Sequence, residues 1–292
     1  MTKKTTICSK LYMPLKDYPT FNLEKAVCNH GFFMMAPNVW DPSTKQFTRP
    51  LRLADSVNSV KVTISQPHDC SLLLIEVHDM ECISDLDKEA IRAQVARMMR
   101  LSPKDEKDLQ EFQNIHPKFK NMGFGRIFRA PSFFEDVVKS MLLCFCSLQN
   151  SLTMAKMLCD LQSELSNGLK RKRNSVRNFP SAKELAGIDV EILKDHCKLG
   201  LRAKHIHEFA KDYHRGRYRL RNFEKCASHE ELYQKLMKIK GCGAYVSNNV
   251  LMCLGFYEKV PIDTETVRHL QEVCMQASPL YFFCFIVFFH QP

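Results

Sequence analysis

The sequence lacks the cysteine spacings of metal and cluster sites. Its thirteen cysteines are scattered over 292 residues, several of them inside apolar runs, and no Cys-x-x-Cys pair occurs. Structural zinc and iron–sulfur clusters are held by closely spaced cysteines, so we expect no metal and no cofactor. The N-terminus also lacks the apolar stretch of a secretory signal. We therefore interpret the cysteines as reduced, mostly buried thiols of an intracellular protein.

Segments long enough to cross a bilayer are missing as well, and no internal repeat is evident. The run Leu280–Phe289 is uninterrupted and apolar but has only ten residues, too few to span a membrane. Left exposed, such a run would promote aggregation. We expect no membrane partner, and we interpret residues 279–292 as a tail that is not the natural end of the domain.

Positive charge is abundant and unevenly distributed. The formal net charge is +10, and residues 166–221 alone hold fifteen Lys/Arg and six Asp/Glu. Such clustering favours a polyanionic partner, although a solvated basic surface is the alternative. A basic linker is predicted at 166–178, and its run Lys170–Arg173 is compatible with a nuclear import signal, a phosphate patch or an exposed loop.

The pattern of apolar residues predicts an α+β protein with a β-rich module at 1–82 and a helical domain at 83–278. Short extended runs separated by turns are expected at 31–36, 46–53, 57–65 and 71–77. Three Ser-x-x-Glu capping boxes, beginning at Ser132, Ser181 and Ser228, indicate helix starts. The predicted helices are 84–101, 103–114, 132–148, 151–165, 181–186, 189–198, 202–214, 228–238, 244–255 and 264–276.

The most informative segment is Gly241-Cys242-Gly243, which lies between two of these helices. Glycine permits positive φ and close backbone approach, so the N–H groups that open the next helix can face a phosphate. Many helices end in glycine, and the Gly-x-Gly pattern is therefore weak by itself. Apolar residues at helical spacing on both sides strengthen it: Leu236, Ile239, Val246 and Val250. The segment predicts a phosphate-binding hairpin.

Asp263 follows Pro261 about twenty positions after the hairpin and begins the next predicted helix. Most aspartates at such a position only cap the helix, but a cap leaves one carboxylate oxygen free. The helix 244–255 travels ~18 Å from the hairpin, and the loop 256–262 can return ~23 Å, so Asp263 can lie beside the hairpin. A lone carboxylate near a bound DNA backbone is what glycosidic-bond chemistry on a nucleotide requires.

Residues 240–269 resemble the helix-hairpin-helix DNA glycosylase superfamily, whose motif is a hairpin, a helix and a loop ending in a catalytic Asp. Residues 129–159 and 179–213 resemble its core helices, and the β-rich start resembles the N-terminal module of its alkyladenine and 8-oxoguanine branch. The resemblance covers most of residues 20–270. It implies a monomeric DNA glycosylase of base excision repair, in the nucleus or an organelle, that binds double-stranded DNA and flips out the damaged base.

The resemblance also implies roles for individual residues. Asp263 would stabilise the developing oxocarbenium charge and activate the attacking water. The hairpin would hold a DNA phosphate, with a bound monovalent cation as a possible mediator, through Gly241, Cys242, Gly243, Tyr245 and Val246. Gln149 and Asn150 match the segment that fills the vacated base stack or touches the orphaned partner base. A polar turn between two helices would have the same sequence.

Two departures from the family pattern change the expected chemistry. Tyr245 occupies the position of the nucleophilic lysine of bifunctional relatives, and a phenol cannot form a Schiff base. We therefore expect monofunctional hydrolysis of an alkylated purine or 8-oxoguanine, with Tyr245 lining the base pocket or simply packing. Relatives also continue with several helices where this chain has its apolar tail. The alternatives are thus a non-catalytic duplex-binding protein or inactive truncated product, and, less well, a helical protein-interaction domain.

Overall fold

The computed structural model describes residues 7–67, 71–80, 82–115, 120, 122–169, 176–218 and 228–268. Its N-terminal part contains a five-stranded antiparallel sheet with strand order β1-β5-β4-β3-β2. The strands are β1 (Ile7–Pro14), β2 (Val39–Asp41), β3 (Gln46–Arg52), β4 (Ser59–Ser65) and β5 (Leu72–His78). The predicted alternation in β4 is confirmed, because Val60, Val62 and Ile64 are all buried.

The remaining elements are helices. Between β1 and β2 lie α1 (Leu23–Val27) and the 3₁₀ helix η1 (Gly31–Met34). The helices after the sheet are α2 (Asp85–Met99), α3 (Pro103–Ile115), α5 (Phe133–Leu143), α6 (Leu148–Leu169), α7 (Ala182–Ala186), α8 (Val190–Asp195), α9 (Arg202–His214), α11 (His229–Met237) and α12 (Ala244–Leu254). The predicted α+β class is confirmed.

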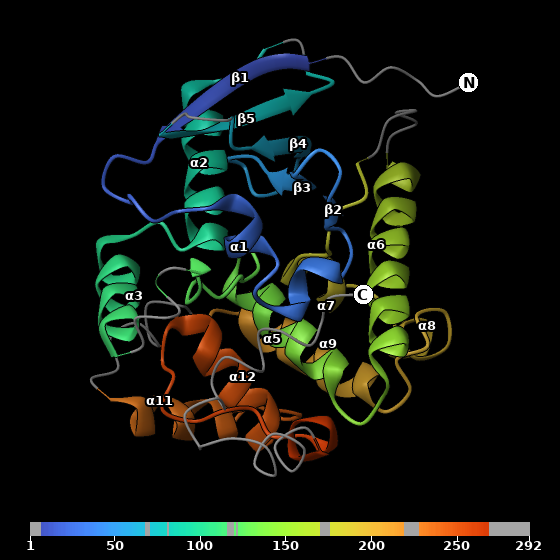
Figure 1. Cartoon of the computed structure of the whole chain (residues 1–292). Coiled ribbons are helices and arrows are strands. Elements are labelled where there is room, and N and C mark those ends of the chain that lie inside the picture. Colours follow the sequence, from blue (N-terminus) through green and yellow to red (C-terminus); the bar gives the residue numbers. More distant parts are fainter. Residues whose placement is uncertain are drawn as a thin grey trace.

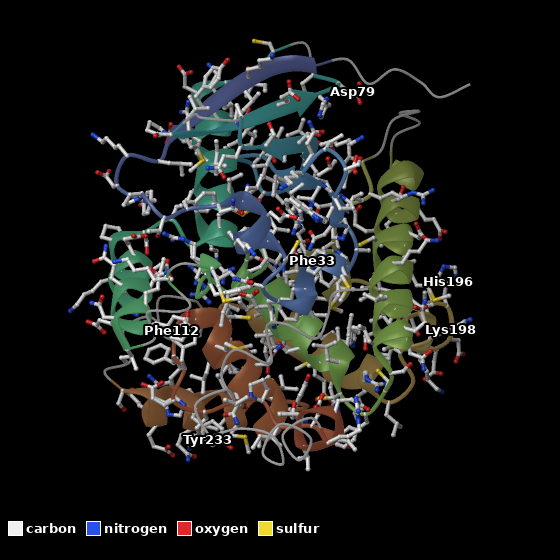
Figure 2. The ribbon with its side chains drawn as sticks, viewed as in Figure 1. Phe33, Asp79, Phe112, His196, Lys198 and Tyr233 are labelled. Carbon is white, nitrogen blue, oxygen red and sulfur yellow. The ribbon has the colours of Figure 1, made fainter. Side chains whose placement is uncertain are left out.

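Helix α5 forms the centre of the molecule. Residues 133–142 are all buried, and α5 packs against α6, α9 and α12. The sheet lies at one end of the molecule and α11 and α12 lie at the other (Figure 1). The buried apolar side chains form one cluster from the sheet to the helices, and Phe33 of η1 lies near its middle (Figure 2). The sheet and the helices therefore share a core.

The expected extended run at 31–36 is wrong, because η1 occupies most of it. Phe32 and Phe33 are neighbours in sequence and both are buried. A strand would point them to opposite faces, whereas a helical turn can bury both on one side. The turn is closed by Met35 N–H, which donates to the Phe32 carbonyl at 3.1 Å.

The helix predicted at 132–148 ends earlier, at Leu143. Cys144 is extended (ψ 135°) and Phe145 has φ +50°, so the chain turns before α6 begins at Leu148. Helix α6 then runs to Leu169, beyond the predicted end at 165 and into the segment predicted as a linker. The run Lys170–Arg173 and the tail 279–292 lie outside the described residues, and the last predicted helix is described over 264–268 only.

The predicted helix starts at Ser132, Ser181 and Ser228 are confirmed. Each serine hydroxyl accepts the backbone N–H of the glutamate three residues later. At Ser181 the Glu184 carboxylate also accepts the Ser181 N–H, which completes a capping box. Throughout the chain as described, no helix combines the length and apolarity needed to cross a membrane.

Candidate functional site

The hairpin joins α11 to α12 and shows the backbone geometry that its glycines allow. Gly241 has φ +85°, in the left-handed region, and a Cβ there would lie 2.8 Å from the Cβ of His205 on α9. Gly243 has an ordinary φ of −75° and is the N-cap residue of α12, and a Cβ there would meet nothing within 4 Å. Gly241 is thus required by packing within the protein, whereas the space at Gly243 is open.

The open space at Gly243 lies in front of the first turn of α12. The first N–H groups of a helix have no acceptor within the helix and carry partial positive charge. Gly243 and Ala244 are exposed, while Cys242 and Val246 are buried in the core. Cys242 and Val246 can therefore contribute to an anion site only through their backbones.

Asp263 caps the helix that follows the loop 255–262, as predicted. Its Oδ1 accepts hydrogen bonds from the backbone N–H and the hydroxyl of Thr266, both at 2.7 Å. The side chain is exposed, and within the described ranges no protein group donates to Oδ2. The carboxylate is therefore fixed in orientation by one oxygen and presents the other to solvent.

Tyr245 is partly buried against the core, close enough to Asp263 and to the α5–α6 turn for their charges to act on its pKa. Burial, followed by the negative charges of Asp263 and of Cys144 as a thiolate, raises the pKa of the Tyr245 phenol. The phenol is consequently neutral at physiological pH and cannot act as a base. The hydrogen bond from Asn248 to the Val260 carbonyl brings the end of the loop back along α12, and the charge of Asp263 acts on Tyr245.

Neither of the lysines nearest to the hairpin motif points to this site. Lys240 pairs with Glu208 of α9 at 3.2 Å. Lys259 pairs with Glu230 of α11 at 3.3 Å, and its ammonium lies 4.6 Å from the centre of the Tyr233 ring. Both ammonium groups therefore have carboxylate partners on α9 and α11 and not Asp263.

Gln149 and Asn150 are exposed in the first turn of α6. The backbone of Asn150 takes part in the helix start, where its N–H donates to the Ser147 hydroxyl at 3.3 Å. The structure therefore brings them near the α5–α6 turn but gives them no contact with Asp263 or Tyr245.

Two exposed apolar side chains beside the site were missed by the sequence reasoning. Phe145, in the α5–α6 turn, is fully exposed, and Leu201, at the start of α9, is 89% exposed. The two segments are joined by Arg202, whose guanidinium donates to the carbonyl of Cys144. Phe145 belongs to an apolar run whose pattern predicts one continuous buried helix. Its exposure follows from the positive φ at this residue, which ends the helix and which the sequence pattern does not indicate. The Gly200-Leu201 pair carried no comparable signal.

Basic side chains surround these two turns. Lys198, which follows α8 (Figure 2), and Lys204 of α9 are both exposed. Lys238 and Lys240 are exposed beside the hairpin. An extended polyanion could therefore contact several exposed cations near the hairpin and on α9.

A buried polar chain links the N-terminal module to α12 one helical turn below Tyr245. Asn249 Oδ1 accepts a hydrogen bond from His30 Nε2 at 3.3 Å, and Asn249 Nδ2 donates to the Ser140 hydroxyl at 2.9 Å. Asn249 and Ser140 are 2% exposed or less. These contacts fix α12 against α5 and against the residue that precedes η1.

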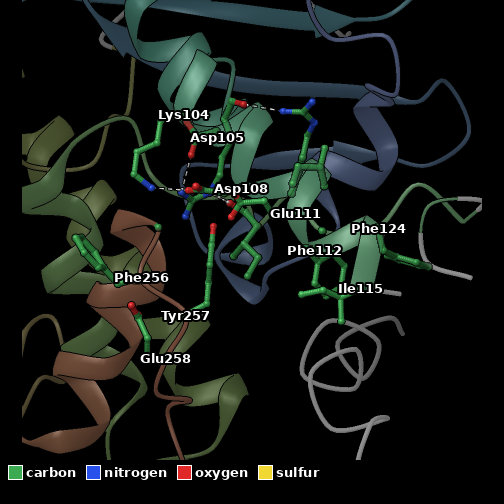
Figure 3. A pocket seen from close by; sticks show the side chains of 16 residues that line it. Lys104, Asp105, Asp108, Glu111, Phe112, Ile115, Phe124, Phe256, Tyr257 and Glu258 are labelled. Carbon is green, nitrogen blue, oxygen red and sulfur yellow. Dashed lines mark hydrogen bonds and ion pairs between the residues drawn. The ribbon is translucent and has the colours of Figure 1, made fainter. Parts of the chain in front are cut away.

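A cavity lies elsewhere in the molecule. It has a volume of about 510 Å³ and lies between α3, the segment 124–127 and the loop 255–258 (Figure 3). This is the opposite end of α12 from Tyr245. Charged groups on its wall are paired with one another, Arg100 with Asp105 at 3.0 Å and Lys104 with Asp108. No metal-binding group of three His, Cys, Asp or Glu side chains is found where the structure is described.

No protein-family model matches the sequence, and no curated protein matches it. Solved structures do match the fold. MBOgg1, in complex with a low-affinity DNA ligand, has a TM-score of 0.64 at 19% identity, over 97% of this chain and 91% of its own. The 8-oxoguanine glycosylase/lyase of Clostridium acetobutylicum, bound to double-stranded DNA with cytosine opposite 8-oxoguanine, gives 0.60 at 15% identity, over 91% and 85%. The 3-methyladenine DNA-glycosylase of Archaeoglobus fulgidus gives 0.57 at 20% identity, over 94% and 97%. The chain thus has the fold of DNA glycosylases of the 8-oxoguanine and 3-methyladenine types, as the sequence resemblance predicted.

Proposed function

We propose that the protein is a DNA glycosylase of base excision repair that hydrolyses the N-glycosyl bond of a damaged purine without cleaving the strand. The observation that carries the proposal is Asp263, whose carboxylate is fixed through Oδ1 and open at Oδ2, beside the first turn of α12. On a DNA glycosylase fold, this is where a carboxylate can act on the sugar of a bound nucleotide.

The proposed chemistry uses two properties of that carboxylate. Departure of the base leaves positive charge on the sugar, and a nearby carboxylate stabilises this charge more in the transition state than in the ground state. The free Oδ2 can also accept the proton of the attacking water. The cap made by Thr266 keeps the side chain in one orientation for both steps.

The hairpin would hold the DNA by its backbone. The open space at Gly243 allows a phosphate to approach the N–H groups of α12. A monovalent cation bound to hairpin carbonyls would be compatible with this arrangement. Exposed lysines around the site would add contacts that carry no sequence information.

Monofunctional hydrolysis is supported by the surroundings of position 245. Tyr245 offers no amine, and Lys240 and Lys259 are paired with carboxylates away from Asp263. A Schiff base with the sugar, which strand cleavage would require, therefore has no nucleophile at position 245.

Base flipping would be assisted by Phe145, with Leu201 beside it. An apolar side chain inserted between base steps holds the duplex open after the nucleotide leaves the stack. Both residues are exposed on turns joined by the Arg202–Cys144 contact, which makes them better suited to this task than Gln149 and Asn150. The partner is therefore double-stranded DNA, and the site of action is the nucleus or a DNA-containing organelle.

The proposal is tested by single-turnover reactions on duplexes carrying an alkylated adenine, 8-oxoguanine or uracil, each analysed with and without alkali. We expect strand breaks only after alkali, for one of the two purine lesions, and their loss in Asp263→Asn. Breaks without alkali would refute the monofunctional assignment. Tight binding with no base release from any duplex would instead favour a non-catalytic DNA-binding protein.

A further inference from the structure

The position of Asp263 depends on the loop 255–262, which returns from the end of α12. The loop starts at Gly255, whose φ of +93° reverses the chain, and the guanidinium of the buried Arg100 donates to the Met252 and Cys253 carbonyls just before it. Residues 255–258 then form one wall of the 510 Å³ cavity. This first half of the loop is fixed at its origin, far from Asp263.

Among the described residues, an ion pair and a hydrogen bond hold the second half of the loop. Lys259 pairs with Glu230, but both side chains are about half exposed (46% and 61%), and exposed ion pairs contribute little. The other attachment is a hydrogen bond from the Asn248 side chain, whose Nδ2 donates to the Val260 carbonyl at 3.3 Å. Asn248 is half-buried and belongs to α12 itself.

The Asn248 contact is well placed to control the distance between Asp263 and the hairpin. Asn248 lies three residues after Tyr245, on the same side of α12. The acceptor, Val260, precedes Pro261, which is buried and has a fixed φ, and the residue before a proline is itself restricted. The segment from Val260 to Asp263 is therefore short and stiff, and a shift at Val260 would be transmitted to the carboxylate.

Stability alone does not account for an asparagine here. While Nδ2 donates to the Val260 carbonyl, Oδ1 of the same side chain is buried. No group of the described residues donates a hydrogen bond to this Oδ1. A buried acceptor without a partner costs about 1–3 kcal/mol, comparable to or larger than the gain from one hydrogen bond. An apolar residue of the same size would avoid that cost.

We propose that Asn248 is a positioning residue that holds Val260, and through it Asp263, at the working distance from Tyr245 and the hairpin. The inference rests on the proposed catalytic role of Asp263. Asn248 touches neither DNA nor the reacting atoms, and its effect is on where the carboxylate stands.

The test compares Asn248→Leu, which keeps the size of the side chain and removes both polar atoms, with the wild type and with Lys259→Ala. The substrate is whichever lesion duplex the wild type releases a base from. The single-turnover rate of base release, the Kd for the same duplex and the free energy of unfolding are measured for each protein. Asn248→Ala provides a second variant in case the leucine is not accommodated.

For Asn248→Leu we expect a rate about 10- to 100-fold lower, as small misplacements of a catalytic group produce. The Kd should stay within about twofold, and the free energy of unfolding should be unchanged or higher, because a buried unpaired acceptor is removed. Lys259→Ala should keep the wild-type rate within about twofold, since its ion pair is exposed.

A wild-type rate in both Asn248 variants, or a loss that follows a loss of stability, would overturn the positioning role. If Asp263→Asn is inactive in the same assay, the proposed function survives that result. If Asp263→Asn releases the base as fast as the wild type, or if the wild type releases none, the proposed function fails and the positioning role fails with it.

Discussion

The guanidinium of Arg49 and the carboxylate of Glu135 form a two-pronged ion pair in the centre of the protein. Nη1 lies 3.2 Å from Oε1 and Nη2 lies 3.1 Å from Oε2. Arg49 is on β3 and Glu135 is on α5, and Lys139, one turn further along α5, also contacts Glu135 at 2.8 Å. All three side chains are at most 5% exposed. This pair joins the sheet to α5, against which α12 and the candidate site pack.

Removing the charge of Glu135 should destabilise the protein strongly. In Glu135→Gln both Arg49 and Lys139 remain buried without a counter-charge, a situation that typically costs about 3–5 kcal/mol. Urea unfolding followed by circular dichroism measures this loss. Glu191→Gln is the matched control, because Glu191 pairs with Lys194 on the surface and should change the free energy of unfolding by less than about 0.5 kcal/mol. Equal effects in the two variants would contradict the role assigned to the buried pair.

The same pair predicts how stability depends on pH. Burial alone would raise the pKa of the Glu135 carboxyl, but Arg49 and Lys139 beside it lower that pKa to about 2. The unfolded chain has an ordinary glutamate pKa of about 4.3. Because the folded pKa is the lower one, the stabilisation is fully present above about pH 4.3 and is lost as the pH falls towards 2. The difference in unfolding free energy between the wild type and Glu135→Gln should therefore be constant from pH 7 to 5 and shrink from pH 4 to 3. A difference that grows on acidification would have the wrong sign for this explanation.

Local chemistry explains which parts of this protein were predictable from the sequence. The bend at Gly241 and the cap at Asp263 depend on residues within a few positions of each other, and both appear as expected. Fold class and the glycosylase-like architecture followed from the same motif and its neighbours. The assignment of Gly241, Cys242, Gly243, Tyr245 and Val246 to DNA remains a prediction.

Contacts between distant segments explain what was missed. The turn that exposes Phe145 is bound by Arg202, 58 positions from the Cys144 carbonyl that it contacts. Arg49 and Glu135 are 86 positions apart, and no sequence pattern near either residue predicts that they pair. An apolar run such as the one around Phe145 satisfies a helical pattern whether or not the helix continues. Its interruption is decided by the tertiary structure.

Phe145 should matter for catalysis and not for stability. The side chain is fully exposed, so Phe145→Ala removes no core contact and should leave the free energy of unfolding within about 0.5 kcal/mol of the wild type. If the ring holds the duplex open, the single-turnover rate of base release should fall about tenfold or more, because unstacking costs a few kcal/mol. Leu86→Ala, at a 75% exposed position on α2, is the control and should release the base at the wild-type rate. Unchanged kinetics for Phe145→Ala on both damaged and matched duplexes would assign the ring no part in base flipping.

Replacing each hairpin glycine with alanine should have a different effect, on stability for Gly241 and on DNA affinity for Gly243. Gly241 has φ +85° and a Cβ there would stand 2.8 Å from His205 Cβ, so Gly241→Ala should lower the free energy of unfolding by about 1–3 kcal/mol. Adding His205→Ala should restore part of that loss, because it removes the closest neighbour.

At Gly243 a Cβ fits the free protein, so Gly243→Ala should be as stable as the wild type within about 0.5 kcal/mol. Its methyl group would nevertheless occupy the space in front of α12 where a phosphate is proposed to bind, and its affinity for duplex DNA should fall about tenfold, equivalent to about 1.4 kcal/mol. Gly187→Ala, at an ordinary φ with its nearest neighbours at 3.6 Å, is the control for both measurements. Unfolding in urea and fluorescence anisotropy with a labelled duplex separate the two effects. A Gly243→Ala protein that binds DNA like the wild type would move the phosphate contact away from the hairpin.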